Sequence, residues 1–204
     1  MSAEAACDAA AAAIAGVRGG WFIDSCPLSD GGEGFARILT TSAGGTERMV
    51  SVTGPRGGRV QAPMGLVPME RIPAAAVAIL GGPGGKARGT AAVIDMASAS
   101  GLALLAPGAR DLTRATSRGT GELMMAASAT GAQIIILGVG GSATHDLGLG
   151  ALGALGLRFE GSAGEHLDPV VPADWEFLRT IRGAVPKPFP RILIACDVSN
   201  PLLG

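Results

Sequence analysis

The segment Ile134-Ile-Ile-Leu-Gly-Val-Gly-Gly-Ser-Ala-Thr-His-Asp146 decides the fold. Its first four residues are all apolar, which is typical of a strand that is buried on both faces of a parallel sheet. The small residues from Gly138 predict a loop that reaches about Gly150 and leads into a helix ending near Gly156. A strand, a glycine loop and a helix in this order favour an α/β fold with a parallel sheet.

Similar elements flank this segment on both sides. Further strands are expected at Ala91–Met96 and Arg191–Ala195, so that Asp95 and Asp197 come at or just after strand ends. The remaining predicted elements alternate in type: a helix from Ser2 to Val17, a short strand from Trp21 to Cys26, a glycine loop at 27–34, a helix from Phe35 to Leu39 and a helix from about Gly121 to Thr130.

Residues 47–96 show a different pattern. Glu47–Val67 alternates apolar and polar residues around Gly54-Pro55 and Gly57-Gly58, which predicts a hairpin or meander. Val77–Leu80 is a further predicted strand, followed by a glycine-rich loop at 81–85. Because antiparallel strands do not fit the parallel sheet, we predict that this part forms a second, smaller lobe.

Composition argues against several classes of protein. The 204 residues carry a net charge of -1, so binding to nucleic acid through phosphate neutralisation is not expected. Aromatic residues make up 3% and tyrosine is absent, which argues against base-stacking platforms. Cys7, Cys26 and Cys196 are widely spaced and indicate neither a disulfide framework nor a zinc site. Glu4 and Asp8 interrupt the alanine-rich N-terminus, so we expect a cytoplasmic protein without a membrane or targeting segment.

The loop at 138–146 is the first candidate site. Backbone N–H groups at a helix start favour an anion, and Gly140 and Gly141 leave them accessible. Ser142 and Thr144 add hydroxyl donors, and Asp146 adds a carboxylate for a metal ion or a proton. The loop therefore predicts a cradle for a phosphate or carboxylate, with an ordinary tight turn as the alternative.

Two further loops carry similar residues. The loop at 27–34 contains Asp30 and Glu33, which could share a metal ion or divide acid and base roles; the alternative is a solvated turn. Around Ser117 and Thr120, hydroxyls lie at a helix start, with a capping role as the alternative. Asp197 follows a buried strand, where α/β sheets bind ligands, although such aspartates also cap helices.

Six segments, taken in order, resemble the glycerate kinase family. They are Pro-Leu-Ser-Asp-Gly-Gly-Glu-Gly at 27–34, Val-Thr-Gly-Pro at 52–55, Ala-Val-Ile-Asp-Met-Ala-Ser-Ala-Ser-Gly-Leu at 92–102, Ala-Thr-Ser-Arg-Gly-Thr-Gly-Glu-Leu at 115–123, Gly-Gly-Ser-Ala-Thr at 140–144 and Asp-Val-Ser-Asn-Pro-Leu at 197–202. The resemblance implies a flavodoxin- or Rossmann-like α/β lobe, assigned to 1–46 and 106–204, and a smaller mixed lobe at 47–105. It also implies transfer of the ATP γ-phosphoryl group to D-glycerate with Mg²⁺ in the cleft between the lobes, giving a phosphoglycerate.

The resemblance also implies roles for individual residues. Asp30, Asp146 and Asp197 become the candidate catalytic carboxylates, and Asp30 and Asp197 the candidate Mg²⁺ ligands. We expect those two carboxylates to lie within about 12 Å of each other, the reach of two side chains and a metal-bridged ligand. Candidate substrate- and phosphate-binding residues are Ser29, Gly31, Gly32, Glu33, Ser117, Thr120, Gly140, Gly141, Ser142, Thr144 and Asn200, with Arg56, Arg114 and Arg118 as weaker anion ligands.

The chain departs from the family pattern in three places. Family members are usually far longer and open with an Asp-Ser-Phe-Lys type loop that is missing here, and they continue past the Asn-Pro-Leu segment. Leu147 stands where the family usually has glycine. We therefore expect about half of a kinase, truncated at both ends and inactive by itself. A non-catalytic partial product and a small-acid- or phosphate-binding domain stay open as alternatives, as does the oligomeric state.

Overall fold

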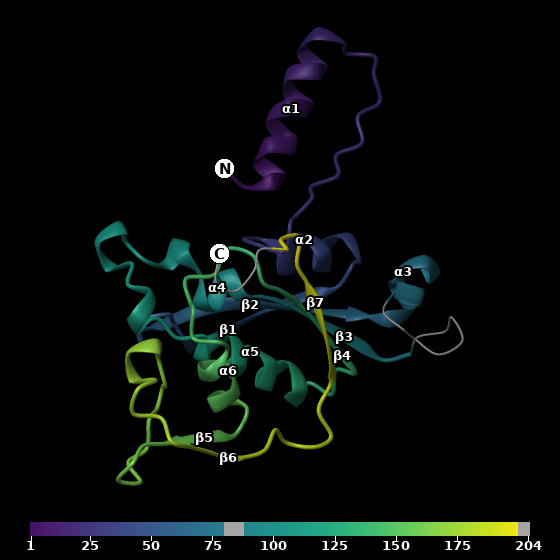
Figure 1. The fold of residues 1–204 in the computed structure, drawn as a ribbon. Coiled ribbons are helices and arrows are strands. Elements are labelled where there is room, and N and C mark those ends of the chain that lie inside the picture. The colour runs from purple at the N-terminus through teal and green to yellow at the C-terminus, as the bar shows by residue number, and fades with distance from the viewer. Residues whose placement is uncertain (80–87, 200–204) are drawn as a thin grey trace.

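The computed structural model describes residues 1–79 and 88–199. A five-stranded sheet in the order β1-β2-β3-β4-β7 forms its centre, and β5 and β6 form a separate two-stranded sheet (Figure 1). The strands span Thr46–Thr53 (β1), Arg59–Pro68 (β2), Thr90–Asp95 (β3), Ile134–Gly138 (β4), Leu157–Glu160 (β5), Thr180–Gly183 (β6) and Arg191–Ala195 (β7). The helices span Ala3–Val17 (α1), Phe35–Ser42 (α2), Ala74–Ile79 (α3), Met96–Ser100 (α4), Arg118–Ala129 (α5) and Leu149–Ala154 (α6).

The predicted parallel strands are confirmed, but the expectation that the strand at 191–195 is buried is wrong: β7 is the last strand of the sheet, and its Ile194 is 66% exposed. β4 lies between β3 and β7 and runs parallel to both, with Ile135 opposite Ala92 on one side and Ile192 on the other. The carboxyl ends of these three strands therefore meet at one edge of the sheet. The helix predicted after the 138–150 loop is also present, as α6. The fold class is α/β, as expected.

The expectation that residues 47–96 stay outside the parallel sheet is wrong. β1 and β2 do form the predicted hairpin, but β2 also pairs with β3 in antiparallel fashion, with Gly65 opposite Val93. The sheet is therefore mixed and continuous, because β3 is parallel to one neighbour and antiparallel to the other. The division into lobes at 1–46 with 106–204 and at 47–105 stays a prediction about folding units.

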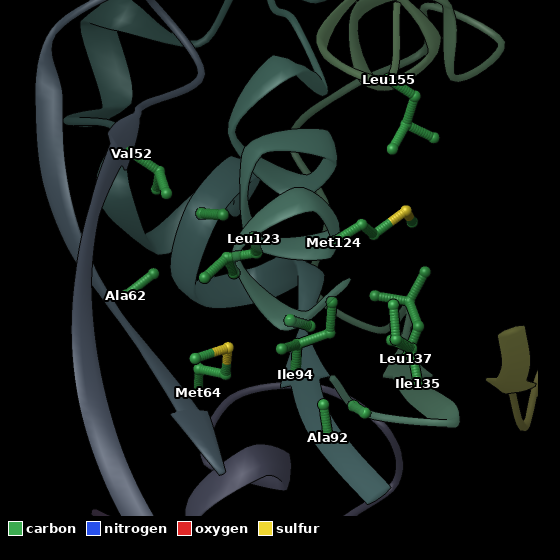
Figure 2. Close-up of a cluster of buried hydrophobic side chains, with 13 residues drawn as sticks. Val52, Ala62, Met64, Ala92, Ile94, Leu123, Met124, Ile135, Leu137 and Leu155 are labelled. Atoms are coloured by element: carbon green, nitrogen blue, oxygen red, sulfur yellow. The ribbon is translucent and has the colours of Figure 1, made fainter. Parts of the chain in front are cut away.

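Helices cover the two faces of the sheet with apolar side chains. On one face of the sheet, Leu123 and Met124 of α5 lie in the same buried cluster as Ile94 of β3 and Ile135 of β4 (Figure 2). On the opposite face, Phe35 of α2 packs against inward-facing positions of β2 and β3. No helix in the described ranges is long and apolar enough to cross a membrane.

Two predicted strands are not observed. Trp21–Cys26 is extended but pairs with no described strand, and Phe22 is 93% exposed. Residues 77–79 of the other segment belong to helix α3, because an alanine-rich run after Pro73 favours a helix; Leu80 lies outside the described residues. The predicted N-terminal helix is present as α1, with the Ser2 hydroxyl accepting from the Ala5 N–H at 3.2 Å. Figure 1 shows α1 standing away from the sheet.

Candidate functional site

Three chain segments meet at the carboxyl edge of the parallel strands. The Gly140 N–H donates to the Gly31 carbonyl at 3.0 Å, and the Val139 N–H donates to the Ala195 carbonyl at 3.2 Å. This contact leaves no room for side chains, since a Cβ on Gly138 would lie 2.4 Å from the Gly31 oxygen. Gly31 itself has φ +95°. Glycines in both loops therefore allow the 27–34 loop to lie directly on the 138–141 loop and the end of β7.

The 27–34 loop presents polar side chains beside this contact. Asp30 is exposed, and its Oδ1 accepts from the Gly32 N–H at 3.0 Å, which fixes the turn. A hollow of about 460 Å³ is lined by Leu28, Ser29, Asp30 and Glu33. The Ser29 hydroxyl is buried and has no hydrogen-bond partner among the described residues. An unpaired buried hydroxyl costs free energy, so Ser29 is available to bind a ligand group.

The 138–146 loop is anchored through its backbone. The Leu102 N–H donates to the Gly141 carbonyl and the Ala143 N–H to the Ser100 carbonyl, both at 2.9 Å. Ser142 is exposed, and neither its hydroxyl nor that of Thr144 bonds to any described residue. A fixed backbone with free hydroxyls is the arrangement that a small-anion cradle needs.

Asp197 is exposed two residues after β7 ends. Because the Gly31 α-carbon faces the Ala195 carbonyl, the segments that carry Asp30 and Asp197 lie next to each other. The predicted separation of the two carboxylates stays a prediction. Asn200, the remaining candidate on this segment, lies outside the described residues.

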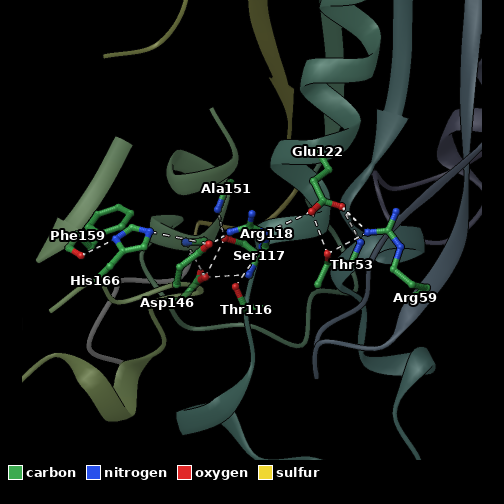
Figure 3. A network of polar contacts seen from close by, with 12 residues as sticks. Thr53, Arg59, Thr116, Ser117, Arg118, Glu122, Asp146, Ala151, Phe159 and His166 are labelled. Carbon is green, nitrogen blue, oxygen red and sulfur yellow. Dashed lines mark hydrogen bonds and ion pairs between the residues drawn. The ribbon is translucent and has the colours of Figure 1, made fainter. Parts of the chain in front are cut away.

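Asp146 has a different environment from Asp30 and Asp197. Its side chain is buried, with 1% exposed, and its oxygens accept four hydrogen bonds from the protein (Figure 3). Ser117 supplies two of them, from its N–H at 2.7 Å and its hydroxyl at 2.8 Å, and the N–H groups of Gly148 and Gly150 supply the others. The Ser117 hydroxyl in turn accepts from Ala151. In this geometry Asp146 and Ser117 join the starts of α5 and α6, and the catalytic role of Asp146 stays a prediction.

A second polar network follows along α5. Glu122 accepts from the Thr53 N–H at 2.7 Å and the Thr53 hydroxyl at 2.9 Å, and it pairs with Arg59 and Arg118 (Figure 3). Burial opposes ionisation of Glu122, but the hydrogen bonds from Thr53 and the two guanidinium groups outweigh it, so its pKa lies below the usual 4.5. Arg118 also contacts Asp168. Sequence reasoning did not single out Glu122, although it falls in the segment 115–123.

Other candidates make contacts within the protein. The Thr120 hydroxyl bonds to that of Ser100 at 2.9 Å in the interior. Arg56 and Arg114 both face Asp111, at 4.0 and 3.9 Å. Asp95 is fully buried and accepts from Ser98 and from the Ala36 N–H, which is the capping alternative for a strand-end aspartate.

The edge of the sheet offers carboxylate oxygens, a ligand type that Mg²⁺ uses in proteins. Among the described residues there is no group of three or more acidic, histidine or cysteine side chains that could hold a metal ion alone. Mg²⁺ is commonly bound by one or two carboxylates, with phosphate oxygens and waters completing the octahedron. Asp30 and Asp197 supply two exposed carboxylates, and their joint binding of Mg²⁺ stays a prediction.

Comparison with known proteins identifies a family and several relatives. The sequence model of the Glycerate kinase family matches residues 1–204. Glycerate 2-kinase of Escherichia coli (strain K12) is 37% identical over 188 residues, which cover 88% of this chain and 43% of the relative. Glycerate kinase of Bacillus subtilis (strain 168) is 36% identical over 180 residues, which cover 87% and 42%.

The structural comparison agrees. The crystal structure of "putative glycerate kinase 2" from Salmonella typhimurium LT2 superposes with a TM-score of 0.71 at 36% identity, over 94% of this chain and 47% of that one. The chain thus spans less than half the length of these relatives. The family match over every residue and the shared architecture lead to one conclusion: the chain belongs to the glycerate kinase family.

Proposed function

We propose that this chain forms part of the active site of a glycerate kinase that transfers the ATP γ-phosphoryl group to D-glycerate with Mg²⁺. The observation that carries the proposal is the contact of the 27–34 loop with the 138–141 loop at the carboxyl edge of β4 and β7. In open α/β sheets this edge is where ligands bind. Here it also carries the carboxylates of Asp30 and Asp197, which form no ion pair with any described residue, and the free hydroxyls of Ser142 and Thr144.

Each group has a role in this proposal. Asp30 and Asp197 would hold Mg²⁺, which supplies charge neutralisation to the phosphate groups when bound. One of these carboxylates accepts the proton of the attacking glycerate hydroxyl. The free hydroxyls of Ser142 and Thr144, with the N–H of Gly141, hold a phosphate or the glycerate carboxylate, whereas the N–H of Gly140 is taken by the Gly31 carbonyl and positions the loop. Phosphoryl transfer depends on such positioning more than on covalent chemistry.

Ligand binding and turnover test the proposal together. The 204-residue chain is assayed for ADP release with ATP, Mg²⁺ and D-glycerate, beside the Escherichia coli glycerate 2-kinase as a reference. The unfolding temperature is measured with and without D-glycerate, since a ligand stabilises the state that binds it. Asp30→Asn is compared with Asp24→Asn, a matched exposed aspartate outside the site.

We expect D-glycerate with Mg²⁺ and ATP to raise the unfolding temperature of the wild type and of Asp24→Asn, but not of Asp30→Asn. Any D-glycerate-dependent ADP release should fall about 100-fold or more in Asp30→Asn. Equal stabilisation of all three proteins would contradict the proposed site. Stabilisation by D-glycerate without ADP release would identify an acid-binding domain. The absence of both stabilisation and ADP release would identify a non-catalytic product. Analysis of the phosphorylated product would show which glycerate hydroxyl is the acceptor.

A further inference from the structure

We propose that a second pocket, at the opposite edge of the sheet, binds the phosphate group of a small molecule. The pocket has a volume of about 340 Å³ and lies among the turn between α2 and β1, the end of β2, the start of β3 and the end of α5. Its lining combines two arginines, three threonines and small or apolar residues: Gly44, Gly45, Thr46, Arg48, Leu66, Pro68, Arg71, Thr90 and Thr130.

The pocket is separate from the candidate active site. Thr90 is the first residue of β3, whereas Asp95 is the last, and the candidate active site lies at the carboxyl ends of the strands. Six residues of β-strand span roughly 20 Å. A ligand in the pocket therefore occupies neither the hollow beside Asp30 nor the loop that carries Ser142.

The charge of the lining favours an anion. Arg48 and Arg71 contribute two guanidinium groups, and no carboxylate lines the pocket. Arg48 is exposed and makes no ion pair or side-chain hydrogen bond with any described residue. Arg71 directs one Nη1–H to the Gly44 carbonyl, which leaves its other donors available. The guanidinium fork matches the geometry of phosphate oxygens and stays charged at every physiological pH.

The uncharged groups of the pocket favour the same class of ligand. The carbonyl of Gly44 is taken by Arg71, and that of Thr90 accepts from the Gln133 N–H at 3.0 Å. The Thr130 hydroxyl donates to the Ala127 carbonyl at 2.7 Å. The hydroxyls of Thr46 and Thr90 bond to no described residue. Because these acceptors are already paired while guanidinium and hydroxyl donors are free, the pocket suits an oxyanion and not a cation.

The walls of the pocket are held in place. The contact between Arg71 and Gly44 joins the turn after β2 to the turn after α2. Gly45 fits closely against β2, since a Cβ there would lie 2.6 Å from the Leu66 carbonyl oxygen. The volume lies at the lower end of the range for small-molecule sites, which suits a phosphate with a short carbon body.

Calorimetry and thermal unfolding test the pocket with two probes, inorganic phosphate and glycerol 3-phosphate. Ionic strength is held constant with NaCl, so that general screening does not contribute. The decisive variant is Arg48→Gln, because this exposed side chain has no partner whose loss would unfold the protein. Arg71→Gln tests the second guanidinium. Arg110→Gln, another exposed and unpaired arginine, is the matched control, and Asp30→Asn reports on the candidate active site.

We expect both variants of the pocket to weaken binding of the probes about tenfold, as loss of a charge-assisted hydrogen bond requires. Arg110→Gln should bind as the wild type does. Tighter binding of glycerol 3-phosphate than of inorganic phosphate would assign the pocket to phosphomonoesters. Equal affinities for the two probes would assign it to free inorganic phosphate. The proposal is overturned if Arg48→Gln binds as the wild type does, if Asp30→Asn abolishes binding, or if neither probe binds at millimolar concentration.

Discussion

Two parts of the molecule are built from the same small and polar residues but have opposite environments. Around Asp146 and Ser117, every side-chain oxygen is buried and paired with a protein donor. Around Asp30 and Ser142, the backbone is equally well anchored, but the side chains are exposed and the Ser142 hydroxyl is unpaired among the described residues. The difference shows that the presence of glycines, serines and aspartates in a loop does not by itself identify a binding site. A binding site is identified by the side-chain groups that have no hydrogen-bond partner within the protein.

The most severe way to test this contrast is to remove the buried carboxylate. Asp146→Ala leaves several buried N–H groups and the Ser117 hydroxyl without an acceptor, so we expect a loss of about 3 kcal/mol or more in unfolding free energy. Urea denaturation measures it, with Asp24→Ala as the exposed control that should change by less than about 0.5 kcal/mol. A loss below about 1 kcal/mol would show that Asp146 does not hold the starts of α5 and α6 together.

The contact between the 27–34 loop and the 138–141 loop can be disrupted by a substitution at Gly138, the last residue of β4. In Gly138→Ala the added methyl group would lie 2.4 Å from the Gly31 oxygen and 2.8 Å from Phe35 Cδ1. We expect a loss of about 2 kcal/mol and weaker D-glycerate binding, because the 27–34 loop must move away. Gly58→Ala, where no atom lies within 4 Å of the new Cβ, is the control. Unchanged stability and binding would argue against the packed loop contact.

The polar network around Glu122 can be tested through the pH dependence of stability. Its pKa is below 4.5 in the folded protein, so it stabilises the fold above that value and the contribution is lost as pH falls through the folded pKa. Glu122→Gln should cost about 1 kcal/mol at pH 7 and flatten the decline in stability below pH 4.5. Denaturation at several pH values checks this, with the exposed Glu176→Gln as control. Parallel pH curves for wild type and Glu122→Gln would contradict the pKa shift.

The smallest effect on stability is expected at the exposed loop. Ser142→Ala removes a hydroxyl that bonds to no described residue, so the unfolding free energy should change by less than about 0.5 kcal/mol. Binding of D-glycerate or ATP should weaken by about 1 kcal/mol, the value of one neutral hydrogen bond. Calorimetry measures the affinity of the wild type and of Ser142→Ala for D-glycerate and for ATP. If binding stays the same, the loop acts as a structural turn.

Sequence reasoning located the strands whose pattern is local. The runs at 134–137 and 192–195 are continuous and apolar, and both lie in parallel strands of the mixed sheet. Trp21–Cys26 has the same propensity, but a strand also requires a neighbour, and none of the described residues pairs with it. The membership of 47–67 in the main sheet depended on the pairing of β2 with β3, which the local pattern does not contain.

The candidate site shows the same limit. The position of the 138–146 loop followed from a strand end and glycines, which are visible in the sequence. The strand predicted before Asp30 is not observed, and the 27–34 loop is held at this edge by the contact of Gly31 with Gly140 instead. The burial of Asp146 was not predictable, because its main partner, Ser117, lies 29 residues away. Glu122 was missed since its partner Thr53 lies 69 residues away. A glutamate four residues after Arg118 was the available signal, as an i,i+4 pair on a helix.

Helix α1 has a consequence for how unfolding of this protein is observed. None of its 15 residues is buried, so its helicity depends on intrinsic propensity and the Ser2 cap and not on the core. Isolated helices of this length are marginal in water and melt gradually. Circular dichroism at 222 nm will therefore record a sloping loss of signal before the sheet unfolds. Fluorescence of the partly buried Trp175 will follow the body of the protein when the exposed Trp21 beside α1 is replaced by phenylalanine. Two spectroscopic probes of one sample will give different midpoints, and a two-state fit to the dichroism alone will underestimate the cooperativity of the fold.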